Sequence, residues 1–400
     1  ATLTVPPTVL FTTTLPPDQT TTTTTEVSSG PTTTTSSTTS STTEARIAIT
    51  IAAVGDVLPH DAIVASALDS ATGSYDFRPL FAPVASYLSR ADYAVSNLET
   101  RLAGPENGYT GYPLLNSPLS LAYALKLAGF DLVATANNHA LDQGGEGLAI
   151  TLEQLDQIGL PHVGTYRSAK ERATPFIANI KGIKVAFLNY ADWLNGLSPP
   201  EGQELYVVAT LDVDSVARDA AIARMWGAEI VIALLHWGDE YERTPNETQL
   251  EIAEAILSRG VDVILGSHPH MIQPIEHVLE YEDWRIKDKY VVYSLGNFVS
   301  AQRERYRDSG LIAYVHIEKT GLRSRVTGIS YLPVYVQRST EQPVVRYRVL
   351  PVLPGSRIDT DTTLTRADQE RIAAVWDEVR DMLYRPDEDI VPLVPADLDR

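Results

Sequence analysis

Short groups of carboxylate, amide and imidazole side chains come directly after apolar runs in this sequence. Such side chains bind divalent metals and transfer protons, so together they could support metal-dependent hydrolysis. The groups are Gly55-Asp56-Val57-Leu58-Pro59-His60, Asn97-Leu98-Glu99, Asn137-Asn138-His139 with Asp142, His236-Trp237-Gly238-Asp239-Glu240, and Gly266-Ser267-His268-Pro269-His270.

The apolar runs ahead of these groups are typical of buried strands, and amphipathic stretches typical of helices lie between several of them. Strands that alternate with helices predict an α/β fold, a sandwich of central, mostly β sheets flanked by helices. Ligands in open α/β sheets bind at the carboxyl ends of the strands, so we expect all five groups at one edge. The predicted strands are Ile47–Val54, Tyr93–Ser96, Leu132–Ala136, Val185–Asn189, Ile230–Leu235, Val261–Leu265 and Tyr290–Ser294, and the predicted helices are Leu119–Leu127, Gly147–Ile158, Val216–Trp226 and Gln249–Leu257.

Each group alone also has a purely structural interpretation. Asp56 could cap a helix, Asn137 and Asn138 could form a turn, and Glu99 could be a solvated loop charge. The two imidazoles of His268 and His270 flank a rigid proline and converge naturally on a shared ligand. Five such groups at equivalent places in the topology favour a functional site.

The ligand types indicate which metals such a site would hold. The chain has no cysteine, and oxygen with imidazole ligands suits zinc, iron, manganese or magnesium. The carboxylates and histidines exceed what a single four-coordinate metal needs. Two divalent metals bridged by a carboxylate would use the surplus.

Composition limits the classes of function and suggests three regions. The 400 residues carry a net charge of −19, which disfavours nucleic acid as a partner because phosphate contacts need clustered Lys and Arg. Residues 1–44 contain 20 Thr and 6 Ser and predict a disordered stalk, either O-glycosylated or an unmodified linker. We expect a main domain over 45–320 and a β-rich extension with a final helix over 321–400.

The stalk suits a domain held away from a membrane or wall, so we expect an extracytoplasmic protein, attached to the cell envelope or secreted. No run approaches the roughly 20 apolar residues of a membrane span. The chain begins with Ala1 instead of Met, and we expect that a targeting segment is missing from it.

From Ile47 to Asn297 the sequence resembles the CapA family of capsule and poly-γ-glutamate synthesis accessory proteins, which is similar to the calcineurin-type metallophosphatases. The resemblance implies a metallophosphatase-like α/β sandwich. The motifs that carry it are Gly55-Asp56, Asn97-Leu98-Glu99, Asn137-Asn138-His139 with Asp142 and Gly144, His236-Trp237-Gly238 with Glu240, Gly266 with His268-Pro269-His270, Gln273-Pro274 with Glu276, and Ser294-Leu295-Gly296-Asn297-Phe298.

The resemblance implies roles for individual residues. Glu99 stands in place of a bridging aspartate, His139 resembles the histidine that protonates the leaving group, and Asp142 is predicted to be catalytic with it. The superfamily's opening Asp-x-His is absent, and the histidine here comes four residues after the aspartate. The implied metal ligands are Asp56, Glu99, Asn138, His236, His268 and His270.

Three further residues are weaker candidates for the site, namely His60, Glu240 and Arg101. Arg101 could face an anionic substrate or could be a solvated loop arginine. Two functions remain open at this point. One is an envelope metal-dependent hydrolase acting on a phosphoester or an anionic polymer. The other is a non-catalytic, polymer-binding accessory protein that works with membrane proteins of capsule synthesis.

Overall fold

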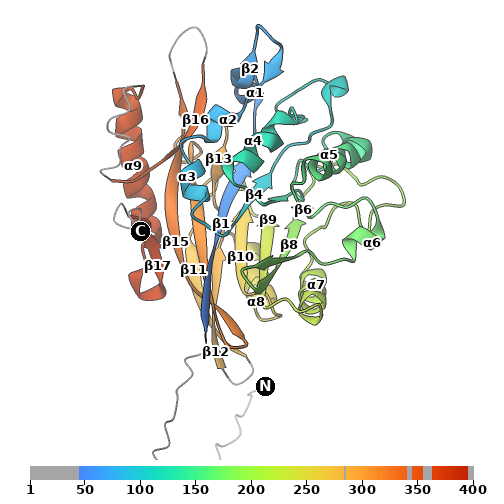
Figure 1. The fold of residues 1–400 in the computed structure, drawn as a ribbon, viewed down its shortest axis with the longest axis vertical. Coiled ribbons are helices and arrows are strands. Elements are labelled where there is room, and N and C mark those ends of the chain that lie inside the picture. Colours follow the sequence, from blue (N-terminus) through green and yellow to red (C-terminus); the bar gives the residue numbers. More distant parts are fainter. Residues whose placement is uncertain (1–44, 283–284, 340–344, 355–362, 395–400) are drawn as a thin grey trace, which may run out of the picture. The chain divides into compact units, whose positions relative to one another are not determined.

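The computed structural model describes residues 45–282, 285–339, 345–354 and 363–394. The predicted stalk, residues 1–44, lies outside the described residues. Two β-sheets form the centre of the described chain, and helices lie beside them (Figure 1). The predicted α/β sandwich is confirmed, and each strand and helix predicted above has a counterpart in the structure.

The first sheet is mixed and contains the N-terminal strand at its centre. β1 pairs in parallel with β4 and antiparallel with β14. Two short strands pair with members of this sheet, β13 (Asn297–Val299) with β1 and β17 (Ile390–Pro392) with β15. The order of the others is β16 (Tyr347–Pro351), β15 (Arg323–Arg338), β14 (Ser309–Thr320), β1 (Arg46–Val57), β4 (Tyr93–Leu98), β5 (Leu132–Ala134) and β6 (His162–Val163).

The second sheet is formed by the middle of the chain. Its central strands β8, β9, β10 and β12 run parallel, and β11 and β7 pair antiparallel at its two edges. A separate hairpin joins β2 (Leu68–Asp69) and β3 (Ser74–Tyr75). The order in the second sheet is β11 (Ile275–Glu282), β12 (Arg285–Val292), β10 (Val263–Ser267), β9 (Ile230–His236), β8 (Ile183–Ala191) and β7 (Ile177–Ile180).

The apolar core has three parts because both faces of both sheets are covered. In β1, Ile49 and Ile51 face the core between the sheets, whereas Ala52 and Val54 face helices on the other side. This double burial explains why the strands are continuous apolar runs. The helices are α1 (Asp61–Ala67), α2 (Arg78–Phe81), α3 (Ala85–Leu88), α4 (Ser120–Ala128), α5 (Gly144–Ile158), α6 (Ala169–Arg172), α7 (Val213–Met225), α8 (Glu247–Leu257) and α9 (Arg366–Leu383).

Local sequence explains several helix ends. The side chain of Asn246 caps α8 and Gln249 completes a capping box, so two free N–H groups at the helix start are satisfied. Helices α4 and α5 end at Gly129 and Gly159, both in the left-handed conformation that glycine adopts without strain.

The C-terminal strands belong to the first sheet. β14 pairs along its whole length with β15, and residue 320, the expected domain boundary, is the last residue of β14. Helix α9 places Ile372, Val375 and Val379 in the core between the sheets, and Figure 1 shows it beside β15 and β17. The final helix predicted near the C-terminus is therefore present.

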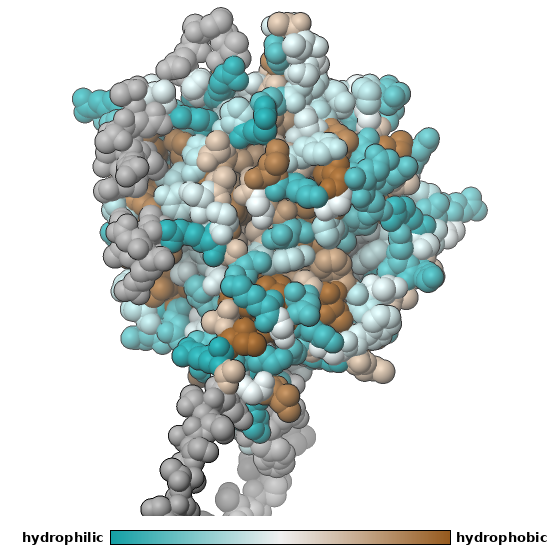
Figure 2. Space-filling model, viewed as in Figure 1, coloured by the Kyte–Doolittle hydropathy of each residue, from teal (hydrophilic) through white to brown (hydrophobic). Residues whose placement is uncertain are grey.

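The visible surface is mainly hydrophilic, with hydrophobic residues in separate groups (Figure 2). This surface agrees with the excess of acidic residues in the sequence. Among the helices that the structure describes, none has the length and apolar character to cross a membrane.

Candidate metal centre

The carboxyl ends of strands from both sheets bring the predicted side chains together. Asp56 lies near the end of β1, Glu99 directly follows β4, and His236 ends β9. Each of the three offers a ligand atom, and these atoms all lie within 4.8 Å of one another. All three side chains are buried. Three of the strand-end residues predicted from sequence therefore lie close together.

Asp56 is placed by a close approach of two backbone segments. Its N–H donates to the carbonyl oxygen of Gly296 at 3.0 Å. A Cβ atom on the preceding residue, Gly55, would lie 1.9 Å from that same oxygen. Only glycine fits at position 55, which explains the Gly-Asp pair.

The carboxylate of Asp56 is held from two sides. Nδ2 of Asn97 donates to Oδ1 at 2.8 Å, and Nδ1 of His270 lies 2.9 Å from Oδ2. Burial alone would raise the pKa of Asp56, but the hydrogen bond and charge of His270, followed by the bond from Asn97, lower it below its ordinary value. This arrangement favours the ionised carboxylate.

Glu99 lies in the middle of the group, and its carboxyl group has fewer hydrogen-bond partners than that of Asp56. Its Oε1 is buried and has no hydrogen-bond partner among the described residues. The same oxygen is 3.8 Å from Nε2 of His236 and 3.9 Å from Nε2 of His270. Burial and the neighbouring charge of Asp56 raise the pKa of Glu99 well above its ordinary value. Two buried carboxylates this close can both ionise only beside a compensating positive charge.

The His268-Pro269-His270 segment has an unusual backbone. His268 has φ +100° and His270 has φ +57°, in the region that favours glycine. Such backbone conformations persist where the surroundings enforce them, often at functional sites. The ring of His268 lies 4.7 Å from that of His236. Burial, and then the charge of His270, lowers the pKa of His268 to about 4, so its imidazole is neutral and able to bind a metal.

Asn138 and His139 reach the group from the segment after β5. Oδ1 of Asn138 lies 3.0 Å from Nε2 of His236. His139 is buried, and its Nδ1 lies 2.6 Å from Oδ2 of Asp142. That oxygen also accepts the N–H of Leu115 at 2.7 Å. Asp142 thus fixes the orientation of the His139 ring.

The weaker candidates are placed differently. Nδ1 of His60 lies 3.1 Å from the carbonyl oxygen of Leu58, and His60 does not belong to the close ligand group. Glu240 is exposed. Its charge contributes to the raised pKa of Glu99, which places it near the rim of the site.

The position of Arg101 decides against one of the two alternatives drawn from the sequence. It is fully buried, so the solvated loop arginine is wrong. Its Nη2 donates to the carbonyl oxygens of Leu98 and Thr135, whereas its Nε and Nη1 are buried and have no hydrogen-bond partner among the described residues. Burial lowers the pKa of Arg101 to about 10, which still leaves it charged at neutral pH.

Four polar residues that support the site had no role assigned from sequence. Asn97 contacts Asp56, and Oγ of Ser267 lies 3.2 Å from Nδ1 of His236. Asn189 on β8 accepts the N–H groups of Thr135 and Ala136, which fixes the chain just before Asn137. Asn297 donates to the carbonyl oxygen of His270. Buried polar residues at strand ends were the signal for all four.

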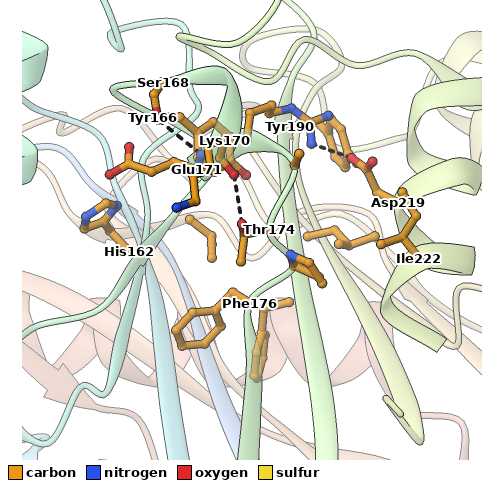
Figure 3. A pocket seen from close by; sticks show the side chains of 16 residues that line it. His162, Tyr166, Ser168, Lys170, Glu171, Thr174, Phe176, Tyr190, Asp219 and Ile222 are labelled. Atoms are coloured by element: carbon orange, nitrogen blue, oxygen red, sulfur yellow. Dashed lines mark hydrogen bonds and ion pairs between the residues drawn. The ribbon is translucent and has the colours of Figure 1, made fainter. Parts of the chain in front are cut away.

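A cavity of about 530 Å³ lies away from this group, and its lining comes from β6, α6, β8 and α7 (Figure 3). In it, Arg172 pairs with Asp219 at 2.6 Å, and its guanidinium lies 5.6 Å from the ring centroids of Tyr166 and Tyr190. None of the predicted site residues lines this cavity.

Comparison with known proteins gives the family. Residues 50–302 match the model of the bacterial capsule synthesis protein PGA_cap family. The chain belongs to this family. The match covers the strand ends from Asp56 to His270 and confirms the resemblance inferred from the motifs.

Two relatives carry names from the same process. The chain is 28% identical over 306 residues to the capsule biosynthesis protein CapA of Bacillus anthracis, covering 74% of this chain and 69% of the relative. It is 30% identical over 274 residues to the PGA biosynthesis protein CapA of Bacillus subtilis, covering 66% and 67%. Among solved structures, the NAD nucleotidase of Haemophilus influenzae is 13% identical with a TM-score of 0.47, covering 85% of this chain and 64% of that one.

Proposed function

We propose that this PGA_cap family member is a metal-dependent hydrolase of the cell envelope that cleaves a phosphoester or a bond in an anionic polymer. The observation that carries the proposal is the buried Oε1 of Glu99, which lacks a hydrogen-bond partner among the described residues and lies between His236 and His270. A buried carboxylate oxygen needs a compensating partner, and a divalent cation is the partner that this set of donors fits.

The proposed ligands are Asp56, Glu99, Asn138, His236, His268 and His270. They supply oxygen and imidazole nitrogen from two sheets, which suits one or two ions of manganese, iron, zinc or magnesium. A metal bound there would polarise the scissile bond and lower the pKa of a bound water. Glu99 is the ligand proposed to bridge two ions.

His139 is the proposed proton donor to the leaving group. Its Nδ1 faces the carboxylate of Asp142 at 2.6 Å, and this contact leaves Nε2 available for proton transfer. Asp142 holds the ring in this orientation. A site that only binds polymer has no need for such a pair.

The second candidate is a non-catalytic accessory protein that binds or transfers the polymer. The names of both CapA relatives favour it, because they refer to biosynthesis. In either case we propose an extracytoplasmic, envelope-attached or secreted protein that works with membrane proteins of capsule synthesis. The Ser- and Thr-rich composition of residues 1–44 supports this location.

Metal analysis combined with an activity screen separates the two functions. The purified chain, loaded in turn with each of the four metals, is assayed with a phosphomonoester, a phosphodiester and γ-glutamyl peptides. We expect metal-dependent turnover of one class and no turnover by the His268→Ala/His270→Ala variant. Metal-loaded protein that turns over none of them but binds an anionic polymer would establish the accessory function instead.

A further inference from the structure

An aromatic side chain lies at the edge of the candidate metal centre. Tyr241, five residues after His236, donates its N–H to the carbonyl oxygen of Pro269 at 2.8 Å. Its ring centroid lies 6.0 Å from that of His270. The backbone of Tyr241 has φ +68°, a conformation that a tyrosine rarely adopts without enforcement from its surroundings. The loop after β9 thus fixes an aromatic ring beside a proposed ligand.

An arginine stacks on this ring. Cζ of Arg307 lies 3.4 Å from the ring centroid of Tyr241. Nδ2 of Asn297 donates to the carbonyl oxygen of Arg307 at 2.8 Å and to that of His270 at 3.3 Å. One side chain therefore ties the backbone of the arginine to the backbone of a proposed metal ligand. The position of Arg307 relative to the site is therefore fixed both by its stacking on Tyr241 and by the hydrogen bond from Asn297.

The guanidinium of Arg307 has few partners compared with its neighbours. Its Nε is buried and has no hydrogen-bond partner among the described residues, and its Nη1 lies 3.8 Å from the exposed carboxylate of Glu304. In contrast, Arg303 donates to two backbone carbonyl oxygens at 2.7 Å, and Arg305 pairs with Glu378 at 2.7 Å. Arg307 retains donors for a further acceptor.

We propose that Arg307, held on the ring of Tyr241, binds a second anionic group of a multiply charged substrate whose reacting bond lies at the metal centre. The inference rests on the proposed function. A planar guanidinium bound to an aromatic face is preorganised to donate two parallel hydrogen bonds to a carboxylate or phosphate. In a chain with a net charge of −19, a cation placed here also offsets repulsion of an anionic substrate.

Binding of two anionic probes tests the proposal. A γ-linked glutamate hexamer presents carboxylates and a glycerol-phosphate hexamer presents phosphodiesters, so the probe that responds identifies the anion. Calorimetry on manganese-loaded protein compares wild type with Arg307→Gln, Arg307→Lys and the matched control Arg305→Gln. Arg305 lies two residues before Arg307, is exposed and pairs with Glu378. Arg305→Gln therefore removes the same charge at a different place on the surface.

We expect Arg307→Gln to weaken binding of one probe at least tenfold, as the loss of a charge-assisted hydrogen bond does. Arg307→Lys keeps the positive charge but cannot donate two parallel hydrogen bonds, so it should weaken binding less. This variant also tests the proposal if Arg307→Gln folds poorly. Arg305→Gln should change binding less than twofold. The proposal would be overturned if Arg307→Gln and Arg305→Gln lost equal binding affinity, or if neither variant of Arg307 lost affinity. It would also be overturned if the wild type bound neither probe.

The same proteins distinguish failure of this proposal from failure of the proposed function. If binding depends on Arg307 but wild type hydrolyses nothing, the hydrolase fails and the anion site stands. If wild type turns over a charged substrate with the same KM as Arg307→Gln, the anion site fails and the hydrolase stands.

Discussion

Oδ2 of Asp142 lies 2.6 Å from Nδ1 of His139, and both side chains are buried. The contact keeps the imidazole in one orientation and leaves one ring nitrogen free. We expect Asp142→Asn to retain metal but to lower kcat by roughly 10²-fold, because an amide holds the ring of His139 in this orientation less firmly than the carboxylate does. Elemental analysis and steady-state kinetics of the same sample measure both quantities. An unchanged kcat would remove Asp142 from the mechanism.

Removing the imidazole itself gives a different signature. We expect His139→Ala to keep its metal and to slow turnover of esters with poor leaving groups by about 10²–10⁴-fold. The loss should shrink for good leaving groups, since these depart without a proton. A series of aryl phosphates with graded leaving-group pKa reports this dependence. A loss of the same size across the series would show that His139 has only a structural role.

The two acidic candidates near the site should behave differently. Glu99→Gln removes a carboxyl group that can ionise when a metal binds beside His236 and His270, so we expect metal affinity to fall by at least about tenfold. Glu240→Gln changes an exposed carboxyl group and should retain metal within about twofold. Metal titration with a fluorescent chelator competitor measures both. If Glu240→Gln bound metal more weakly than Glu99→Gln, Glu240 would be the metal ligand and Glu99 would not.

Metal should stabilise the folded chain through the proposed ligands. At a free metal concentration 100 times Kd, binding adds about 2.7 kcal/mol to the free energy of unfolding. We expect EDTA to lower the Tm of wild type and to leave that of His268→Ala/His270→Ala unchanged. Differential scanning calorimetry with and without EDTA gives both values. An equal fall in both proteins would mean that the metal binds elsewhere.

A histidine remote from the site should make stability sensitive to acid. His316 on β14 lies between the hydroxyls of Thr50 and Ser330, and burial lowers its pKa below the ordinary value. The unfolded chain therefore binds a proton more readily, so stability is full above the unfolded pKa of about 6.5 and falls as pH drops through the folded pKa.

The matched variant His316→Gln keeps hydrogen-bonding groups but cannot titrate. We expect the free energy of unfolding in urea to fall less between pH 7.5 and pH 5.5 in the variant than in wild type. Parallel pH profiles for the two proteins would contradict the assignment.

The sequence was informative about the site because polar residues in buried strands are rare and their positions carry topological information. That Asp56, Glu99 and His236 lie close together was predicted from strand ends, and the structure brings them together, whereas their roles as metal ligands were implied by the family resemblance. The strands themselves were predicted because burial on both faces leaves continuous apolar runs. What the sequence did not indicate was the division of these strands between two sheets. Pairing partners depend on contacts between distant segments, which periodicity does not encode.

Arg101 shows the limit of local reasoning. An arginine next to a loop is usually solvated, but Arg101 is buried, and its Nη2 donates to the carbonyl oxygens of Leu98, which ends β4, and Thr135, which follows β5. Those acceptors come from residues up to 34 positions away. Asn189 was missed for the same reason, because its partners Thr135 and Ala136 directly follow β5, a strand of the other sheet.

The division of the ligands along the chain makes the site a test of fragment reassociation. Asp56, Glu99 and Asn138 precede the connection between β8 and α7, and His236, His268 and His270 follow it. A cut within residues 197–206 would give two pieces that each carry half of the donors. Because β14 of the second piece pairs with β1 of the first, the pieces would interlock through a sheet as well as through a metal. Metal would then hold the two pieces together, and its affinity could be determined from the free metal concentration at which the pieces dissociate.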